Sequence, residues 1–229
     1  MSQMEKVTQD LQNAVFSLRM IDLSRTFQVL GRTARNTASE LGMPLNIEFS
    51  GKEQELDKSI VDKLMDPLCH LLKNAIDHGL YPKFVEMGNS EPLHINVSAY
   101  QKSGYFYISI KDDGVGLSRE KILQKAYNEG IIGANESPDE NEVYKLIFRN
   151  GFSTKEEVTN ISGRGVGMNS VYDTIKSMRG DIDVNTEANK GTEFIVKIPL
   201  SLAMFNGVVA TLNDKKYVVP NSDISEILN

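Results

Sequence analysis

The sequence has few of the residues that form covalent or metal crosslinks in small proteins. Among its 229 residues there is one cysteine, Cys69, no tryptophan and three histidines. A single cysteine excludes a disulfide within the chain and any zinc site made of several cysteines, so we expect a buried thiol. There is no signal peptide and no apolar run near 18 residues, which predicts a soluble, cytoplasmic protein without direct membrane insertion.

Neither sign of charge is concentrated in one part of the chain. Asp and Glu number 31 against 25 Lys and Arg, so the formal net charge is −6, and the basic residues are spread along the sequence. We therefore expect no nucleic-acid partner, because nucleic-acid surfaces concentrate Lys and Arg. With 40% hydrophobic and 24% charged residues, the composition is that of a globular protein with enough apolar residues for a core.

Apolar periodicity predicts helices and strands in an order that differs from the βαβ alternation of dinucleotide-binding folds. Helical spacing is found at 5–18, 23–41, 59–78, 119–128, 140–149 and after Gly167. Alternation predicts strands at 44–49, 93–100, 105–113, "DIDVNT", "TEFIVKIPL", "GVVATL" and "KYVVP". Pro67 should kink the third helix or restart it. We expect an α+β fold, a two-layer α/β sandwich whose mixed, mostly antiparallel sheet has its helices on one face.

The stretch "HLLKNAIDHG" (70–79) places polar residues on one face of a predicted helix. At about 100° per residue, Asn74 and His78 lie about 40° and 80° round from His70, and Lys73 and Asp77 share this polar side. Such a face is commonly just solvated. Asparagine is a poor helix former, however, and its oxygen with a histidine nitrogen four residues away could bind one cation. The helix alone leaves both interpretations open.

A first glycine cluster, "KDDGVGLS" (111–118), follows a predicted strand. Gly114 and Gly116 would let the backbone turn tightly and let a flat ligand approach. Asp112 could accept a hydrogen bond from an exocyclic amine such as the amino group of adenine. Asp-Gly turns are common, so an ordinary turn is the alternative interpretation.

A second glycine cluster, "SGRGVGMNSV" (162–171), leads into a predicted helix. Backbone N–H groups in such a loop, together with the helix dipole, favour a phosphate. The spacing of Gly163, Gly165 and Gly167 matches neither the dinucleotide-binding G-x-G-x-x-G nor a Walker loop. A flexible surface loop is the alternative.

Taken in order, with "KGTEF" (190–194), these motifs resemble the Bergerat ATP-binding fold shared by gyrase, Hsp90, MutL and the histidine kinases. Asn74 matches the asparagine box and Asp112 the first glycine box. The stretch "IFRNGFSTK", with Phe148 and Phe152, is similar to the phenylalanine box, and 163–167 to the second glycine box. Five motifs in the family's order are a specific signal.

Position 70 discriminates between branches of that family. ATP-hydrolysing members carry a glutamate there, whereas this chain has His70. With "NAIDHG" after it, the histidine resembles that of the chemotaxis kinases of the CheA family, and the similarity covers nearly the whole chain. It implies the end of a dimerisation helix at 1–18, an ATP-binding kinase domain at 19–202 with a lid at about 118–162, and the start of a CheW-like regulatory domain at 203–229.

The resemblance implies ATP and Mg²⁺ as cofactors and a role for each matching residue. Asn74 would bind Mg²⁺, with His78 as a supporting ligand. His70 would act near the γ-phosphate as a base or orienting group, and Asp112 would bind adenine N6. The other ATP-binding residues that it implies are Lys73, Asp77, His78, Gly114, Gly116, Phe148, Phe152, Ser153, Thr154, Lys155, Gly163, Arg164, Gly165, Val166, Gly167, Met168 and Thr192.

The implied function is transfer of the ATP γ-phosphate in trans to a histidine on a separate phosphotransfer domain. His70 and His78 belong to the asparagine box and His94 to a predicted strand, so none is expected to be the acceptor. Other implied partners are a CheW-like adaptor, the chemoreceptor array and response regulators, with a homodimer in the full-length protein. Two alternatives remain open: a nucleotide-dependent docking module without turnover, and an ATP hydrolase of the Hsp90 or MutL type.

Overall fold

The computed structural model describes residues 7, 18–88, 91–133, 138–149, 152 and 167–200 and, for their backbone, 207–212 and 215–220. The helices are α2 (Ser24–Glu40), α3 (Lys58–Asn74), α4 (Tyr81–Glu86), α5 (Arg119–Asn128), α6 (Glu140–Lys145) and α7 (Met168–Ser177), with a π-helix η1 (Ala75–Leu80) and a 3-10 turn η2 (Leu146–Phe148). The strands are β1 (Met20–Asp22), β2 (Leu45–Ser50), β3 (Glu55–Asp57), β4 (Leu93–Lys102), β5 (Tyr105–Asp112), β6 (Asp181–Glu187), β7 (Gly191–Pro199), β8 (Gly207–Leu212) and β9 (Lys215–Pro220). Apart from Val7 and Leu18, the helix predicted at 5–18 lies outside the described residues.

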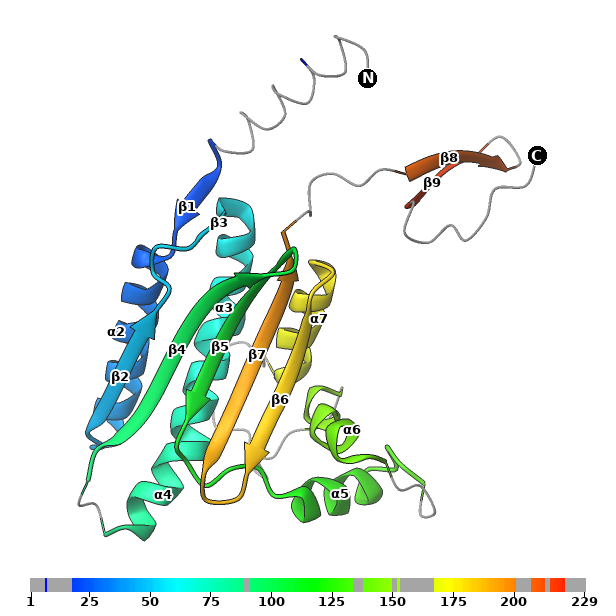
Figure 1. The fold of residues 1–229 in the computed structure, drawn as a ribbon. Helices are drawn as coiled ribbons and strands as arrows, with labels where there is room; N and C mark the ends of the chain where they lie inside the picture. The colour runs from blue at the N-terminus through cyan, green and yellow to red at the C-terminus, as the bar shows by residue number, and fades with distance from the viewer. Residues whose placement is uncertain are drawn as a thin grey trace.

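Five strands form the central sheet in the order β2-β4-β5-β7-β6. Strand β2 pairs with β4 in parallel, and the other three pairings are antiparallel. Helices α2, α3 and α7 lie on one face of this sheet (Figure 1). The predicted α+β fold, with a mixed, mostly antiparallel sheet and helices on one face, is therefore confirmed. Within the described ranges, no helix has both the length and the apolar character needed to cross a membrane.

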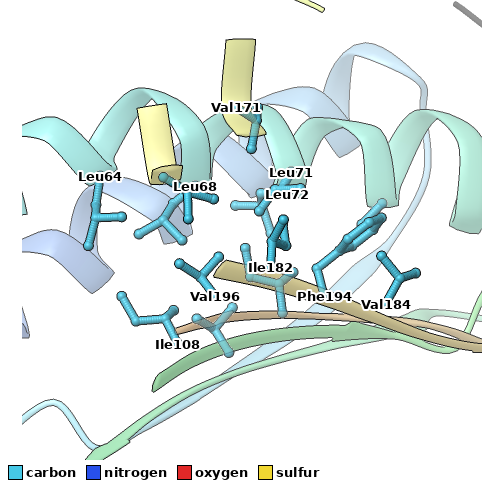
Figure 2. Packing of buried hydrophobic residues seen from close by; sticks show 14 of the residues in the cluster. Leu64, Leu68, Leu71, Leu72, Ile108, Val171, Ile182, Val184, Phe194 and Val196 are labelled. Carbon is cyan, nitrogen blue, oxygen red and sulfur yellow. The ribbon is translucent and has the colours of Figure 1, made fainter. Parts of the chain in front are cut away.

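The core lies between α3 and the sheet. In β7, alternate residues such as Phe194 and Val196 are buried, as the period of two requires. Leu68, Leu71 and Leu72 of α3 point toward them across the layer (Figure 2). Each fully buried side chain of this size stabilises the fold by roughly 1.5–3 kcal/mol relative to an exposed one, so this layer holds α3 firmly on the sheet.

Helix α3 carries the polar stretch that the sequence singled out. It begins after Asp57, whose Oδ1 accepts a hydrogen bond from the Ser59 N–H at 2.7 Å. The helix is continuous through Pro67, so the restart considered for that position is not found. Pro67 is buried, and it has no N–H for the hydrogen bond within the helix. At Asn74 the α-helix passes into the π-helix η1, a geometry that is frequent at functional sites.

Candidate functional site

Asp112 ends β5 with its side chain buried, only 3% of the residue being exposed. Its Oδ1 accepts hydrogen bonds from the backbone N–H groups of Gly114 at 2.9 Å and Thr192 at 3.2 Å. Burial raises the pKa of this carboxyl to about 6 and the charge of Asp113 adds to the rise, while the two N–H donors and the Lys83 ammonium oppose it. At neutral pH, Asp112 is therefore an ionised hydrogen-bond acceptor in poorly solvated surroundings.

Asp112 belongs to a polar row at the end of three neighbouring strands. On the helix-facing side of β5, β7 and β6, the alternation of apolar residues ends in Asp112, Thr192 and Thr186. Thr186 and Thr192 face each other across β6 and β7, with their hydroxyl oxygens 3.1 Å apart. Hydrogen-bonding groups thus replace core side chains at this end of the sheet, where a ligand with a flat face and a polar edge would meet the protein.

Glycine residues let the backbone reach the Asp112 carboxylate. A Cβ atom at Gly79 would lie 2.9 Å from Asp112 Oδ1, and one at Gly114 would overlap the carbonyl group of Gly79. The Val115 N–H donates to the Gly79 carbonyl oxygen at 3.0 Å, and Gly116 has a φ of +76°. The predicted tight turn is confirmed, and it is packed against a buried carboxylate, unlike an ordinary surface turn.

The polar face predicted for 70–78 is present, but its residues differ in exposure. His70, Asn74 and Asp77 are half-buried, whereas Lys73 and His78 are exposed. Residues on the opposite side, among them Leu68, Leu71 and Leu72 (Figure 2), are fully buried. His70 and Asn74, one helical turn apart, are therefore held by the protein and still open to a ligand.

Asn74 contacts the start of α7, 94 residues further along the chain. Its Nδ2 donates to the Met168 Sδ at 2.9 Å, which leaves Oδ1 as the atom that can bind a cation. Gly167 is the N-cap of α7, and among the described residues no side-chain cap is found for this helix. These N–H groups and the helix dipole favour an anion beside Asn74. The phosphate-binding role of Gly167 and Met168 stays a prediction, now supported by this contact.

The two phenylalanines of the predicted phenylalanine box lie in apolar surroundings. The Phe148 ring stacks on Tyr172 with 5.6 Å between centroids and meets Phe194 edge-on at 6.5 Å. Phe152 is buried, and the Lys125 ammonium lies 5.7 Å from the centre of its ring. Phe148 and Tyr172 also line an open groove of about 530 Å³. The structure shows both phenylalanines as packing residues, and their contact with ATP stays a prediction.

Part of the predicted site and lid lies outside the described residues. This holds for Ser153, Thr154, Lys155, Gly163, Arg164, Gly165 and Val166. In the described part of 118–162, helix α5 confirms the helix predicted at 119–128, and α6 with η2 covers most of 140–149. Among the residues that the structure describes, no group of three or more His, Cys, Asp or Glu could hold a metal ion.

Comparison with protein families matches residues 60–202 to one described as "Histidine kinase-, DNA gyrase B-, and HSP90-like ATPase". The chain belongs to this ATPase family. The match includes the Asn74 helix, the Asp112 loop and Thr192, so the predicted resemblance is confirmed. ATP is accordingly the nucleotide that this domain is built to bind.

The chain is similar over its whole length to one kind of member of this ATPase family. It is 39% identical to the chemotaxis protein CheA of Klebsiella aerogenes over 100% of its residues and 34% identical to CheA of Bacillus subtilis over 97%. It spans about a third of the length of these curated relatives, 35% and 34% respectively.

A solved structure shows the ATPase fold independently. The catalytic domain of histidine kinase ThkA, in a nucleotide-free form, matches 79% of this chain and 94% of its own with a TM-score of 0.51. Sequence identity is 16%, so this likeness concerns the fold alone. It confirms the Bergerat-type arrangement of sheet and helices.

The predicted Mg²⁺ ligands fit that ion unequally. Mg²⁺ takes oxygen ligands and keeps several of its waters, and the Asn74 Oδ1 is such a ligand. Imidazole nitrogen suits Zn²⁺ and copper better, so His78 would act through a bound water more readily than directly. Mg²⁺ itself stays a prediction.

Several residues of this candidate site were missed by sequence analysis. The Lys83 ammonium donates to the Asp113 carbonyl oxygen beside the buried carboxylate, and no pattern in the sequence marks this lysine. Gly79 follows the asparagine box directly, and Thr186 is the last inward residue of the predicted strand "DIDVNT". Extending the strand alternation to its end would have found Thr186.

Proposed function

We propose that this chain is the ATP-binding catalytic core of a chemotaxis-type histidine kinase, acting in the cytoplasm. It transfers the ATP γ-phosphate in trans to a histidine on a separate phosphotransfer domain. The observation that carries this proposal is His70, half-buried one helical turn before Asn74, where ATP-hydrolysing branches have a glutamate. An imidazole here can orient the incoming histidine or take its proton.

The geometry supports a site whose two ends bind different parts of ATP. The buried carboxylate of Asp112 accepts from the adenine amino group, beside Gly114 and Thr192. The junction between Asn74 and the start of α7 takes the phosphates. Both ends are fixed on the same core, because Gly79 of η1 lies against Asp112. One rigid unit thus fixes the distance between the base and the phosphates.

Catalysis in this proposal rests on positioning and charge, as is general for phosphoryl transfer. Mg²⁺, when bound, neutralises charge on the phosphate oxygens. Asn74 Oδ1 would hold it, with the exposed Lys73 and His78 on the polar side of the same stretch. His70 then has only to align the acceptor imidazole with the γ-phosphate.

The acceptor comes from another domain. His94 lies in β4, with its side chain exposed between the buried Leu93 and Ile95. It therefore points to the sheet face opposite α3, away from Asn74. Other partners in this proposal are a CheW-like adaptor, chemoreceptors and response regulators, with a homodimer in the full-length protein; the support for them is the similarity to CheA chains.

The test is phosphotransfer in trans. The chain is incubated with γ-labelled Mg-ATP and an excess of a separate chemotaxis phosphotransfer domain, and the label is followed. We expect acid-labile label on the added domain, and its loss in Asn74→Ala. Lys102→Ala, at the other end of the β4–β5 hairpin from Asp112, is the matched control and should transfer like wild type.

The other outcomes decide between the two alternatives. Label that is released only as free phosphate would establish an ATP hydrolase and remove the role given to His70. ADP binding without any turnover would favour a nucleotide-dependent docking module. Labelling of the isolated chain that is lost in His94→Gln would show that the acceptor lies in this chain.

A further inference from the structure

The single hydroxyl of Thr186 takes part in three hydrogen-bond contacts. Its Oγ1 accepts from the Leu117 N–H at 2.9 Å and lies 3.1 Å from both the Gly191 carbonyl oxygen and the Thr192 Oγ1. The Leu117 N–H can only donate, and the Gly191 carbonyl can only accept. The one proton of Thr186 therefore decides the direction of the contact with Thr192.

Directing that proton toward the Gly191 carbonyl oxygen gives each of the three contacts a proton. If it pointed to Thr192 instead, two oxygen atoms would face each other at 3.1 Å with lone pairs alone between them. With the proton on the Gly191 side, Thr192 supplies its own hydroxyl proton to Thr186, and each of the three contacts contains one proton. The Thr192 oxygen is then left with lone pairs only.

Thr192 occupies a place where this polarity matters. Only 5% of the residue is exposed, and its backbone N–H donates to the Asp112 Oδ1 at 3.2 Å. Both side chains lie on the helix-facing side of the sheet. Since little water can reach Thr192, the direction of its hydroxyl is determined by protein partners. The base site consequently presents two acceptors, the Asp112 carboxylate and the Thr192 hydroxyl.

We propose that Thr186 is a positioning residue that makes the Thr192 hydroxyl an acceptor, and that the site thereby selects a base with an exocyclic amine over a 6-oxo base. This inference rests on the proposed function, in which Asp112 binds the adenine amino group. The two N–H bonds of that amino group complement two acceptors. The oxygen of hypoxanthine would instead meet lone pairs on both, which leaves buried polar groups unpaired.

The test compares two ligands that differ in the group at C6 and in N1, which carries a proton in hypoxanthine and none in adenine. ADP and inosine diphosphate are titrated by calorimetry into the whole chain without metal. In Thr186→Val the Thr192 proton loses its acceptor and can turn to the ligand. The ratio of the two dissociation constants, inosine diphosphate over ADP, is expected to fall about fivefold, the factor that one net hydrogen bond provides.

Two further variants separate this role from a structural one. Thr186→Ser keeps the hydroxyl and is expected to retain the wild-type ratio. Thr186→Ala lacks the hydroxyl and must show the same fall as the valine variant, so it replaces that variant if valine prevents folding. A general loosening of the site would weaken both ligands together and leave the ratio unchanged.

The outcomes distinguish this inference from the proposed function. An unchanged ratio in Thr186→Val and Thr186→Ala, with wild type still preferring ADP, overturns the role of Thr186 and leaves the ATP site standing. The proposed base site itself is overturned if wild type binds neither ligand, or if Asp112→Asn binds ADP as tightly as wild type does.

Discussion

Replacing Asp112 by asparagine is expected to stabilise the protein while weakening adenine binding. At pH 7.5 the folded state keeps this carboxyl ionised although burial raises its pKa from 3.8 to about 6. Such a rise corresponds to about 3 kcal/mol less stability, because one pKa unit is worth about 1.36 kcal/mol. Asparagine has the same shape, its Oδ1 can accept the same bonds from Gly114 and Thr192, and it carries no charge to desolvate.

The gain in stability from Asp112→Asn should become smaller as the pH falls. The pKa of Asp112 is higher in the folded than in the unfolded state, so the folded state binds more protons between about pH 4 and 6. Wild type therefore loses stability as the pH rises through this window. The advantage of Asp112→Asn should be about 3 kcal/mol at pH 7.5 and about 1 kcal/mol at pH 4.5.

Thermal unfolding followed by circular dichroism measures this gain. For a chain of this size, the stabilisation at pH 7.5 corresponds to a midpoint about 6–12 °C above wild type. Glu53→Gln, which removes an exposed carboxyl, is the control and should leave the midpoint unchanged at both pH values. A less stable Asp112→Asn at pH 7.5, or the same gain at pH 4.5, would refute the link between burial and charge at this site.

Three further perturbations test the packing and the protonation of the site. Gly114→Ala is expected to lower stability by about 1–3 kcal/mol and to weaken ADP binding, because the added methyl group overlaps the Gly79 carbonyl; urea unfolding and calorimetry measure both effects. Phe148→Ala is expected to lower the unfolding free energy by about 3–5 kcal/mol, since the ring is buried against Tyr172, and a loss below about 1 kcal/mol would contradict that packing. The affinity for adenosine, which has no phosphate, is expected to fall about tenfold per pH unit below pH 6 as Asp112 gains a proton; a flat profile would argue against the base contact.

Much of the fold could be predicted because its signals are local. Alternating apolar residues identified β4, β5, β6 and β7, and helical spacing identified α2 and α3. Strands β1 and β3 were missed, since three residues are too few to show an alternation. The passage from α-helix to π-helix at Asn74 was also missed, because the same residues fit an uninterrupted helical period.

The order of the motifs in the sequence determined the family, and the residue types at positions 70, 74 and 112 determined which chemistry to expect. Motif order and residue type are properties of the sequence alone. They can be read without knowledge of any contact, and the family comparison confirmed the family.

Only the tertiary structure decided how these residues act together. Asn74 meets Met168 across 94 positions of the chain, and Asp112, Thr192 and Thr186 form one row because β5, β7 and β6 are neighbours in the sheet. The raised pKa of Asp112 and the contact of the Thr192 hydroxyl with Thr186 follow from burial and from partners on other strands. The physical reason is that periodicity acts over a few residues, whereas desolvation and hydrogen-bond direction depend on whichever groups the packed core brings together.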